Sequence, residues 1–432
     1  MNATTLNLAS LLDSQARVTP ERTALVCGAV RLTYAELHAR VCQLAVGLRL
    51  RGLGPGDHIA LSCPNTPHFV MAYFAILKLG GVVVPLNVLL KPREIEYHLR
   101  DSDAKALLVF EGAPGLPMAA MAREACDRME APPPIVVMTI APGAPGPIHG
   151  AATLGELMHG QPATCVSHPT APDDTAVMLY TSGTTGQAKG AELTHLNMTL
   201  NAIAGRDLVM PALDNGVAAK NVTLITLPLF HSFGQTALLN AAISGGFTAV
   251  LMPRMDPATV FQAFAEEQVL WWAGVPTMFW ALLQYARAAG PAAIEAARSL
   301  RVCMSGGAPL PVQLLKDFQE TFGVQVLEGY GLSETSPIAS FNQMHRPSKP
   351  GTVGLPISGC EIAVVNDRDD ALPAGRAGEV VIRGHNIMKG YYKRPAETRE
   401  ALRGGWFHTG EDRKSTRLNS SHVSESRMPS SA

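Results

Sequence analysis

Charge is scarce in this sequence. Charged residues make up 16% of the 432 residues, against about a quarter in an average soluble protein, and the formal net charge is -1. A balance so close to zero provides no electrostatic attraction for a polyanion, so we expect no nucleic-acid partner. Hydrophobic residues reach 47%. A chain of this length and apolarity is expected to fold into two or three subdomains around large buried sheets.

The cysteines also lack the regular spacing of a disulfide framework or a metal site. The cysteines are scattered without any C-x-x-C spacing, at the seven positions 27, 42, 63, 126, 165, 303 and 360. An odd number with this spacing argues against a disulfide framework and against a zinc site. No basic and apolar leader opens the chain, so secretion is not indicated. We therefore expect a cytoplasmic protein in a reducing environment.

No uninterrupted apolar run of membrane-spanning length is present. The most apolar stretch, residues 69–86, is broken by Lys78 and by the pair Gly80 and Gly81. We interpret it as a buried helix that ends at the glycines and is followed by a strand over 82–84. The sequence thus predicts no transmembrane span. It leaves open whether the protein contacts a membrane peripherally and whether it forms oligomers.

The sequence does contain a phosphate-binding pattern at residues 180–190, YTSGTTGQAKG. Glycines leave backbone N–H groups open to an anion, hydroxyl groups donate further hydrogen bonds, and Lys189 adds a positive charge. A strand-like segment at 176–180 precedes the loop and a helical pattern opening near Thr194 follows it, as in many nucleotide-binding α/β proteins. The spacing differs from the P-loop of the common NTPases. A loop of serine, threonine and glycine alone is more often a plain linker, so the length of the pattern and Lys189 carry the interpretation.

Three further segments contain residues suited to nucleotide chemistry. The segment 228–234 reads PLFHSFG, although a lone histidine among aromatic residues, here His231, is more often a satisfied core residue. The glycines of SGGAPL at 305–310 allow close approach to the backbone, although glycine–proline turns are common. The segment 328–335, EGYGLSET, is more specific. It combines an aromatic face, a hydroxyl group and the carboxylate of Glu334, a ligand type that suits Mg²⁺.

These four motifs, in this order, resemble those of the adenylate-forming superfamily, which includes acyl-CoA synthetases, aryl-CoA ligases, firefly luciferase and the adenylation domains of peptide synthetases. The resemblance extends from a helix start at 32–37 to Gly410. Two positions depart from the family pattern, since Ala188 stands where proline is usual and Ser333 where threonine is usual. The resemblance implies an α/β fold with two doubly wound α/β subdomains and a small β subdomain. It also implies ATP, Mg²⁺ and coenzyme A as ligands.

The resemblance implies roles for individual residues as well. The expected catalytic residues are Lys189, Glu334 and His231, with Glu334 as the Mg²⁺ ligand. The expected ATP-binding residues are Thr181, Ser182, Gly183, Thr184, Thr185, Gly186, Gly306, Gly307, Ala308, Pro309, Glu328, Gly329, Tyr330, Gly331, Ser333 and Glu411. The expected acyl-pocket residues are His231, Phe233, Gly274, Val275, Pro276 and Gly306.

We expect the chain to divide in sequence order. A loop-like boundary separates a first α/β subdomain, 1–171, from a nucleotide-binding α/β subdomain, 172–348. From residue 349 the pattern changes to short strands between glycines, at 361–365 and 378–384. This pattern predicts a small β subdomain over 349–411. The resemblance implies that this subdomain closes one side of the ATP cleft.

The end of the sequence departs from the family. The resemblance implies an aspartate for the ribose hydroxyls after the segment GWFHTG at 405–410, and this chain has Glu411. Residues 412–432 are rich in serine and show no apolar periodicity, so we expect a disordered tail. The tail resembles a translated sequencing adaptor joined to a truncated gene. On that interpretation Glu411 is a product of the junction, and the family's small C-terminal lid domain, with its catalytic lysine, is missing.

The resemblance implies that the intact parent is an acid–thiol ligase, which converts a carboxylic acid and ATP into an acyl-adenylate and then transfers the acyl group to coenzyme A. We expect the truncated copy itself to be poorly active. The overall run of sequence is most similar to bacterial medium- and long-chain fatty acyl-CoA ligases, so a fatty acid is the expected substrate. Two alternatives stay open. One is a ligase for an aryl acid such as a cinnamate or benzoate, and the other is a fragment that binds ATP without turnover.

Overall fold

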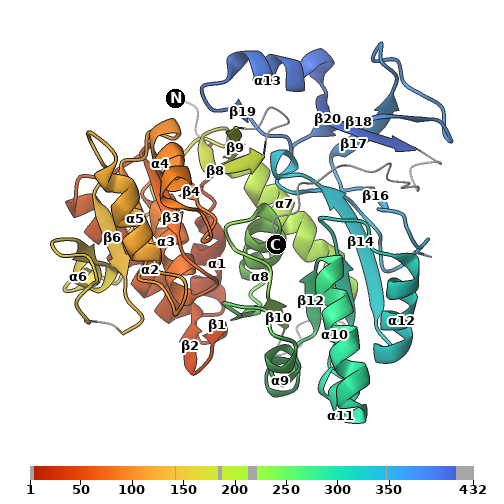
Figure 1. The fold of residues 1–432 in the computed structure, drawn as a ribbon, viewed down its shortest axis with the longest axis horizontal. Helices are drawn as coiled ribbons and strands as arrows, with labels where there is room; N and C mark the ends of the chain where they lie inside the picture. Colours follow the sequence, from red (N-terminus) through yellow and green to blue (C-terminus); the bar gives the residue numbers. More distant parts are fainter. Residues whose placement is uncertain (1–3, 142, 183–186, 213–220, 347, 415–432) are drawn as a thin grey trace.

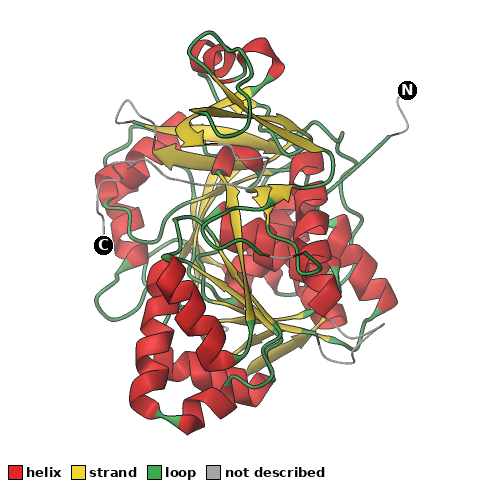
Figure 2. Cartoon of the chain, turned by 90° about the vertical axis from the view of Figure 1, so that its right-hand side faces the viewer, coloured by secondary structure: helices red, strands yellow, loops and turns green. Residues whose placement is uncertain are grey.

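The computed structural model describes residues 4–141, 143–182, 187–212, 221–346 and 348–414. Within them the chain forms two large, mostly parallel sheets and one small antiparallel sheet. Helices pack on both sides of the large sheets, and the small sheet lies at one end of the molecule, blue in Figure 1 and uppermost in Figure 2. The expected α/β architecture with an added β unit is confirmed.

The first large sheet has eight strands in the order β19-β9-β8-β4-β3-β5-β6-β7. Strands β3 to β8 run parallel to one another, and β9 and β19 are added antiparallel at one edge. The strand bounds are His58–Ser62 (β3), Val82–Pro85 (β4), Ala106–Phe110 (β5), Ile135–Met138 (β6), Ala152–Thr153 (β7), Thr175–Ser182 (β8), Ala188–Thr194 (β9) and Gly390–Tyr391 (β19). The helices of this half are Ser10–Val18 (α1), Tyr34–Leu50 (α2), Pro67–Lys78 (α3), Pro92–Asp101 (α4), Met118–Asp127 (α5) and Leu154–Met158 (α6).

The second large sheet has nine strands in the order β16-β15-β14-β13-β12-β10-β11-β1-β2. Its six central strands, β14 to β1, are parallel. The strand bounds are Thr23–Cys27 (β1), Val30–Thr33 (β2), Val222–Ile225 (β10), Thr248–Leu251 (β11), Trp271–Gly274 (β12), Val302–Ser305 (β13), Gln325–Gly331 (β14), Ile338–Phe341 (β15) and Leu355–Pro356 (β16). The helices that follow in sequence are His195–Val209 (α7), Ala241–Ser244 (α8), Pro257–Glu267 (α9), Pro276–Ala289 (α10), Pro291–Ala296 (α11) and Val312–Phe322 (α12).

Shorter elements complete the fold. The small sheet pairs β17, Cys360–Val365, with β18, Ala377–Gly384, and β18 with β20, Phe407–Lys414. Helix α13 spans Pro395–Ala401. Single turns of 3₁₀-helix and one π-helix occupy Met210–Ala212 (η1), Phe233–Asn240 (η2, the π-helix), Ser333–Thr335 (η3) and Arg403–Gly405 (η4).

The sheets do not follow the order of the chain, which corrects the expected division at residues 171 and 348. Strands β1 and β2, from the N-terminal part, belong to the nine-stranded sheet, and β8 and β9 belong to the eight-stranded sheet. Strand β19 also joins the eight-stranded sheet, although it lies within the range expected for the β unit. Composition does not reveal such exchanges, because a buried strand has the same apolar pattern in either sheet.

The most apolar stretch of the chain folds as expected. Helix α3 ends at Lys78, Gly80 adopts a φ of +77°, and β4 begins at Val82. A left-handed glycine after the last turn is a common way to end a helix. Among the described helices, none combines the length and the apolarity that crossing a bilayer needs.

The phosphate-binding pattern lies in a β-hairpin, which corrects the expected arrangement of strand, loop and helix. Strand β8 is antiparallel to β9, with Ser182 opposite Ala188, and helix α7 begins only after β9. Thr194 caps that helix as expected, since its hydroxyl accepts a hydrogen bond from the N–H of Asn197. The loop residues Gly183, Thr184, Thr185 and Gly186 lie outside the described residues.

Residues 412–414, where the sequence predicts the start of a disordered tail, form a strand instead. Strand β20 continues to Lys414, and its residues 412–414 pair with the start of β18. Three polar residues give little apolar signal, and the pairing uses backbone groups that any residue possesses. Residues 415–432, the rest of the expected tail, lie outside the described part of the chain.

Candidate functional site

The motif segments meet at the carboxyl ends of parallel strands. Gly274 ends β12 and pairs with Ser305 at the end of β13, and Ser305 pairs with Glu328 on β14. These three positions therefore form one row across the nine-stranded sheet. Because each motif continues directly from this row, the expected acyl-pocket and adenine segments lie side by side. Open α/β sheets commonly place ligands at this edge.

Contacts between two of these segments are direct. A Cβ at Gly306 would lie 3.1 Å from Cε1 of Phe233, so the aromatic ring lies against the bare glycine. Gly307 has a φ of +78°, and a Cβ there would lie 3.5 Å from Cγ1 of Val275. The structure thus brings three expected pocket residues, Phe233, Val275 and Gly306, to one wall. Ala308 and Pro309 follow this wall as exposed residues.

Gly274 has a packing role. A Cβ there would lie 2.5 Å from Cη2 of Trp272, whose side chain is fully buried. Any side chain at Gly274 would therefore displace this buried indole ring. Pro276 occupies the first turn of α10, where its missing N–H costs nothing. A direct contact of Gly274 or Pro276 with substrate stays a prediction.

His231 lies in the turn that leads from β10 into the π-helix η2. Its N–H donates to the carbonyl of Pro228 over 3.1 Å, and its carbonyl accepts from the N–H of Gln235 over 2.9 Å. The imidazole is exposed to solvent, yet neighbouring protein atoms crowd it enough to lower the pKa of His231. A neutral ring at physiological pH suits a site for an apolar acid. The catalytic role of His231 stays a prediction.

The side chain of Glu328 is buried. Its carboxylate accepts a hydrogen bond of 3.0 Å from the N–H of Gly351, and its carbonyl accepts from Asn342. Burial raises the pKa of Glu328 to about 7, although the backbone amides of Gly351 and Leu310 act in the opposite direction. The side chain therefore holds the loop around Gly351 beside the motif.

The glycines on either side of Tyr330 are required by close contacts, one with a side chain and one with the backbone. A Cβ at Gly329 would lie 2.1 Å from Cε2 of Phe341, and one at Gly331 would lie 1.7 Å from the carbonyl oxygen of Pro337. Tyr330 itself packs against a small apolar cluster, which consists of Val380 and Ile382 on the three-stranded sheet and Ala339 on β15. The expected base-stacking residue thus lies between two sheets.

Glu334 and Lys189 are joined by a residue that the sequence did not indicate. The hydroxyl of Tyr391 donates a hydrogen bond of 3.0 Å to Oε1 of Glu334. The Nζ of Lys189 lies 5.4 Å from the centroid of the same ring, within the range of a cation–π contact. Strand β19 places Tyr391 there by pairing with β9, where Tyr391 lies opposite Ala191. Burial and the nearby carboxylate of Glu334 raise the pKa of Tyr391, so the phenol keeps its proton.

The remaining expected residues are placed as follows. Thr181 and Ser182 end β8, Ser333 opens the turn that contains Glu334, and Glu411 lies on β20. The N–H of Glu411 donates to Oγ1 of Thr409 over 3.1 Å. The ribose contact expected of Glu411 stays a prediction.

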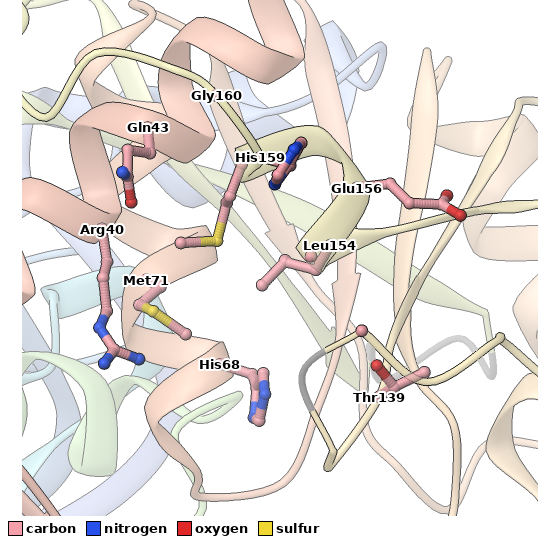
Figure 3. A pocket seen from close by; sticks show the side chains of 12 residues that line it. Arg40, Gln43, His68, Met71, Thr139, Leu154, Glu156, His159 and Gly160 are labelled. Carbon is pink, nitrogen blue, oxygen red and sulfur yellow. The ribbon is translucent and has the colours of Figure 1, made fainter.

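A separate cavity of about 590 Å³ lies in the N-terminal half, away from these motifs (Figure 3). Helices α2, α3 and α6 line it together with the segment after β6. Its labelled residues include Arg40, His68, Met71, Leu154 and His159. They come from no motif singled out in the sequence.

Comparisons with known proteins agree with this geometry. A family model described as "AMP-binding enzyme" matches residues 12–392. The chain is 34% identical over 400 residues to a feruloyl-CoA synthase from Amycolatopsis, covering 92% of this chain and 74% of the relative. It is 30% identical over 423 residues to a long-chain-fatty-acid–CoA ligase from Bacillus subtilis, covering 93% and 73%. The structure of the anthranilate CoA ligase AuaEII with anthranoyl-AMP superposes with a TM-score of 0.83 at 27% identity, covering 94% and 75%. The chain therefore belongs to the family of AMP-binding enzymes, the adenylate-forming superfamily that its motifs resemble.

Proposed function

We propose that this protein is an ATP-dependent acid–CoA ligase. In the first half-reaction a substrate carboxylate oxygen attacks the α-phosphorus of ATP, the bond to the β-phosphate breaks, and pyrophosphate leaves. In the second, the thiol of coenzyme A loses its proton and attacks the acyl carbon, and AMP leaves. The observation that carries the proposal is the joining of Lys189 and Glu334 by Tyr391 beside the β8–β9 hairpin.

The side chains at this place suit the charges of the first half-reaction. Lys189 offers a positive charge to the phosphates and lies on β9 next to the loop that the sequence assigns to them. Glu334 offers one carboxylate, and Mg²⁺ in nucleotide sites is commonly held by one or two carboxylates together with substrate phosphates. These residues therefore fit a Mg–ATP complex. When bound, Mg²⁺ would neutralise part of the charge that develops between the carboxylate and the α-phosphate.

A fatty acid is the first proposed substrate class. Phe233 and Val275 supply an apolar wall next to the glycines at the end of β13, and His231 adds a ring that is neutral near pH 7. The similarity to the long-chain-fatty-acid–CoA ligase from Bacillus subtilis supports the same class.

An aryl acid is the second candidate. The feruloyl-CoA synthase from Amycolatopsis is 34% identical to this chain. The structural relative with anthranoyl-AMP likewise holds an aromatic acyl group. The ring of Phe233 beside Gly306 is compatible with an aromatic substrate that stacks on it.

Pyrophosphate release measured with a series of carboxylic acid substrates tests the proposal. Octanoate, palmitate, ferulate and cinnamate would each be supplied with ATP, Mg²⁺ and coenzyme A, and thioester formation would be measured by mass spectrometry. We expect the highest kcat/KM for a fatty acid. A higher kcat/KM for ferulate would establish the aryl alternative. ATP binding by calorimetry without pyrophosphate release for any acid would instead support a nucleotide-binding protein without turnover.

A further inference from the structure

Two cysteines that lie 123 residues apart in the sequence meet in the fold, and neither belongs to a motif described above. Cys42 lies on α2 and is fully buried, whereas Cys165 lies between α6 and β8 and is partly exposed. The thiol of Cys42 points to the backbone of Cys165, with its Sγ 4.0 Å from the carbonyl oxygen of that residue. Solvent therefore has access to one member of a thiol pair whose other member is enclosed.

Charged and polar groups from three helices and one loop surround this pair. The Nζ of Lys78, from α3, lies 2.5 Å from Oδ1 of Asp13 on α1 and donates to Oγ of Ser167 over 3.1 Å. The Nε2 of His38, from α2, lies 3.2 Å from Oδ1 of Asp13 and 3.7 Å from Sγ of Cys42. Only 1% of the Lys78 side chain is exposed, so its charge acts through protein and not through water.

These neighbours affect the two thiols differently. The hydrogen bond from Cys42 lowers the pKa of the Cys165 thiol, burial raises it, and the charges of Lys78 and His38 lower it further. Asp13 opposes them but is itself held by Lys78. The same hydrogen bond, together with burial, raises the pKa of Cys42. The pair thus consists of a thiolate-favoured, accessible sulfur and a protonated, enclosed one.

We propose that Cys165 and Cys42 form an oxidisable dithiol site whose substrate is a hydroperoxide. The Cys165 thiolate attacks the outer oxygen of the hydroperoxide, the O–O bond breaks, and the alkoxide takes a proton and leaves as an alcohol, or as water from hydrogen peroxide. Cys165 is then a sulfenic acid. Cys42 attacks its sulfur, the S–O bond breaks, the S–S bond forms, and water leaves with the proton of the Cys42 thiol. His38 is placed to receive that proton first.

The alternative is a purely structural role, in which both cysteines are small apolar residues that fill space beside a buried ion pair. One observation argues against it. The buried Lys78 donates to Ser167, two residues from Cys165, and a charged group there is not needed for packing. Redox-active cysteines characteristically have a cation and a second thiol near an accessible sulfur. Cys27 is an internal comparison, because it is also partly exposed but burial alone raises its pKa.

Alkylation of the native protein tests the reactivity of the site. The wild-type protein is treated with limiting iodoacetamide at pH 7, and the labelled peptides are quantified by mass spectrometry over time. We expect Cys165 to react about tenfold faster than Cys27, since an ordinary thiol is only slightly ionised at this pH. Equal or slower labelling of Cys165 would overturn the proposal.

Oxidation tests the second step. After treatment with hydrogen peroxide, we expect a linked peptide pair of Cys42 and Cys165, lighter by two hydrogen atoms and split by a reductant. Cys42→Ser should prevent this link and leave a sulfenic acid on Cys165 that a dimedone probe traps, whereas the matched variant Cys27→Ser should form the link normally. If Cys42→Ser does not fold, the peptide map of the wild type decides alone. A map without the Cys42–Cys165 link after oxidation would refute the proposed dithiol site.

Neither the alkylation test nor the oxidation test requires ATP or a carboxylic acid. Their outcome is therefore independent of the proposed ligase activity.

Discussion

Tyr391 donates a 3.0 Å hydrogen bond to Glu334, although 57 residues separate them in the chain. The same ring lies beside Lys189. One phenol thus positions the carboxylate proposed for Mg²⁺ and the lysine proposed for the phosphates. Because the pKa of Tyr391 is raised by burial and by Glu334, the contact persists across the physiological pH range.

Replacing Tyr391 by phenylalanine tests this positioning role. Tyr391→Phe removes the hydrogen bond to Glu334 but keeps the ring beside Lys189, so we expect kcat for pyrophosphate exchange to fall about 10- to 100-fold, as for the loss of one hydrogen bond to a charged group. The neighbouring variant Tyr392→Phe is the matched control, since that hydroxyl donates to Asp103 at the surface. Equal effects of the two variants would argue against a specific role for Tyr391.

Replacing the proposed metal ligand tests its charge. Glu334→Gln keeps the shape of the side chain and its contact with Tyr391, but it removes the negative charge that a hard cation prefers. We expect a higher Mg²⁺ concentration for half-maximal pyrophosphate exchange and a lower maximal rate. A Mg²⁺ titration of both proteins measures the effect. A titration indistinguishable from that of wild type would make Glu334 a structural carboxylate.

A methyl group at Gly306 tests the proposed acyl wall. In Gly306→Ala the new Cβ lies 3.1 Å from the Phe233 ring, so either the ring moves or the slot narrows. We expect kcat/KM for the preferred acid to fall at least about tenfold, the scale of a small steric change in a pocket. The double variant with Phe233→Leu should recover part of the loss, because the two residues are in contact. Purely additive losses would show that the two positions act independently.

The pH dependence of stability tests the state of Glu328. Its pKa is raised by burial from 4.5 to about 7, so the folded protein binds this proton more tightly than the unfolded chain. Stability should therefore fall as the pH rises from about 4.5 to 7, by on the order of 1–3 kcal/mol. Glu328→Gln, which can still accept from Gly351, should flatten this part of the profile. Urea unfolding at pH 5 and pH 8 measures the difference, and the same slope in both proteins would contradict the assignment.

Shortening Glu411 tests the ribose contact. If Glu411 holds the ribose hydroxyls, Glu411→Asp should change ATP affinity several-fold, the scale of about 1 kcal/mol for a charged hydrogen-bond pair. We expect tighter binding, because the family pattern has aspartate there. Calorimetry with ATP measures it, and Glu400→Asp on helix α13 is the control for a general effect of the substitution. Unchanged affinity would place Glu411 outside the nucleotide site.

Much of the local structure follows from neighbouring residues alone. Helix α2 begins where the Thr33 hydroxyl accepts from the N–H of Glu36, and the Glu36 carboxylate accepts from the N–H of Thr33. Helix α3 ends at Lys78, just before the glycine pair that the sequence predicts as its stop. Strand β9 was missed because its residues, AKGAELT, have little β-propensity. It is a strand because the hairpin and the pairing with β19 satisfy its backbone.

The sequence by itself determined the family, the α/β class and the order of the motifs, since these depend on residue types at short spacings. Only the tertiary structure decided which strands share a sheet, that Tyr391 joins Lys189 to Glu334, and that Cys42 meets Cys165. These relationships depend on long-range pairing. The hydrogen bonds of a strand are the same whichever partner it takes, so its choice is made by the packing of the whole core.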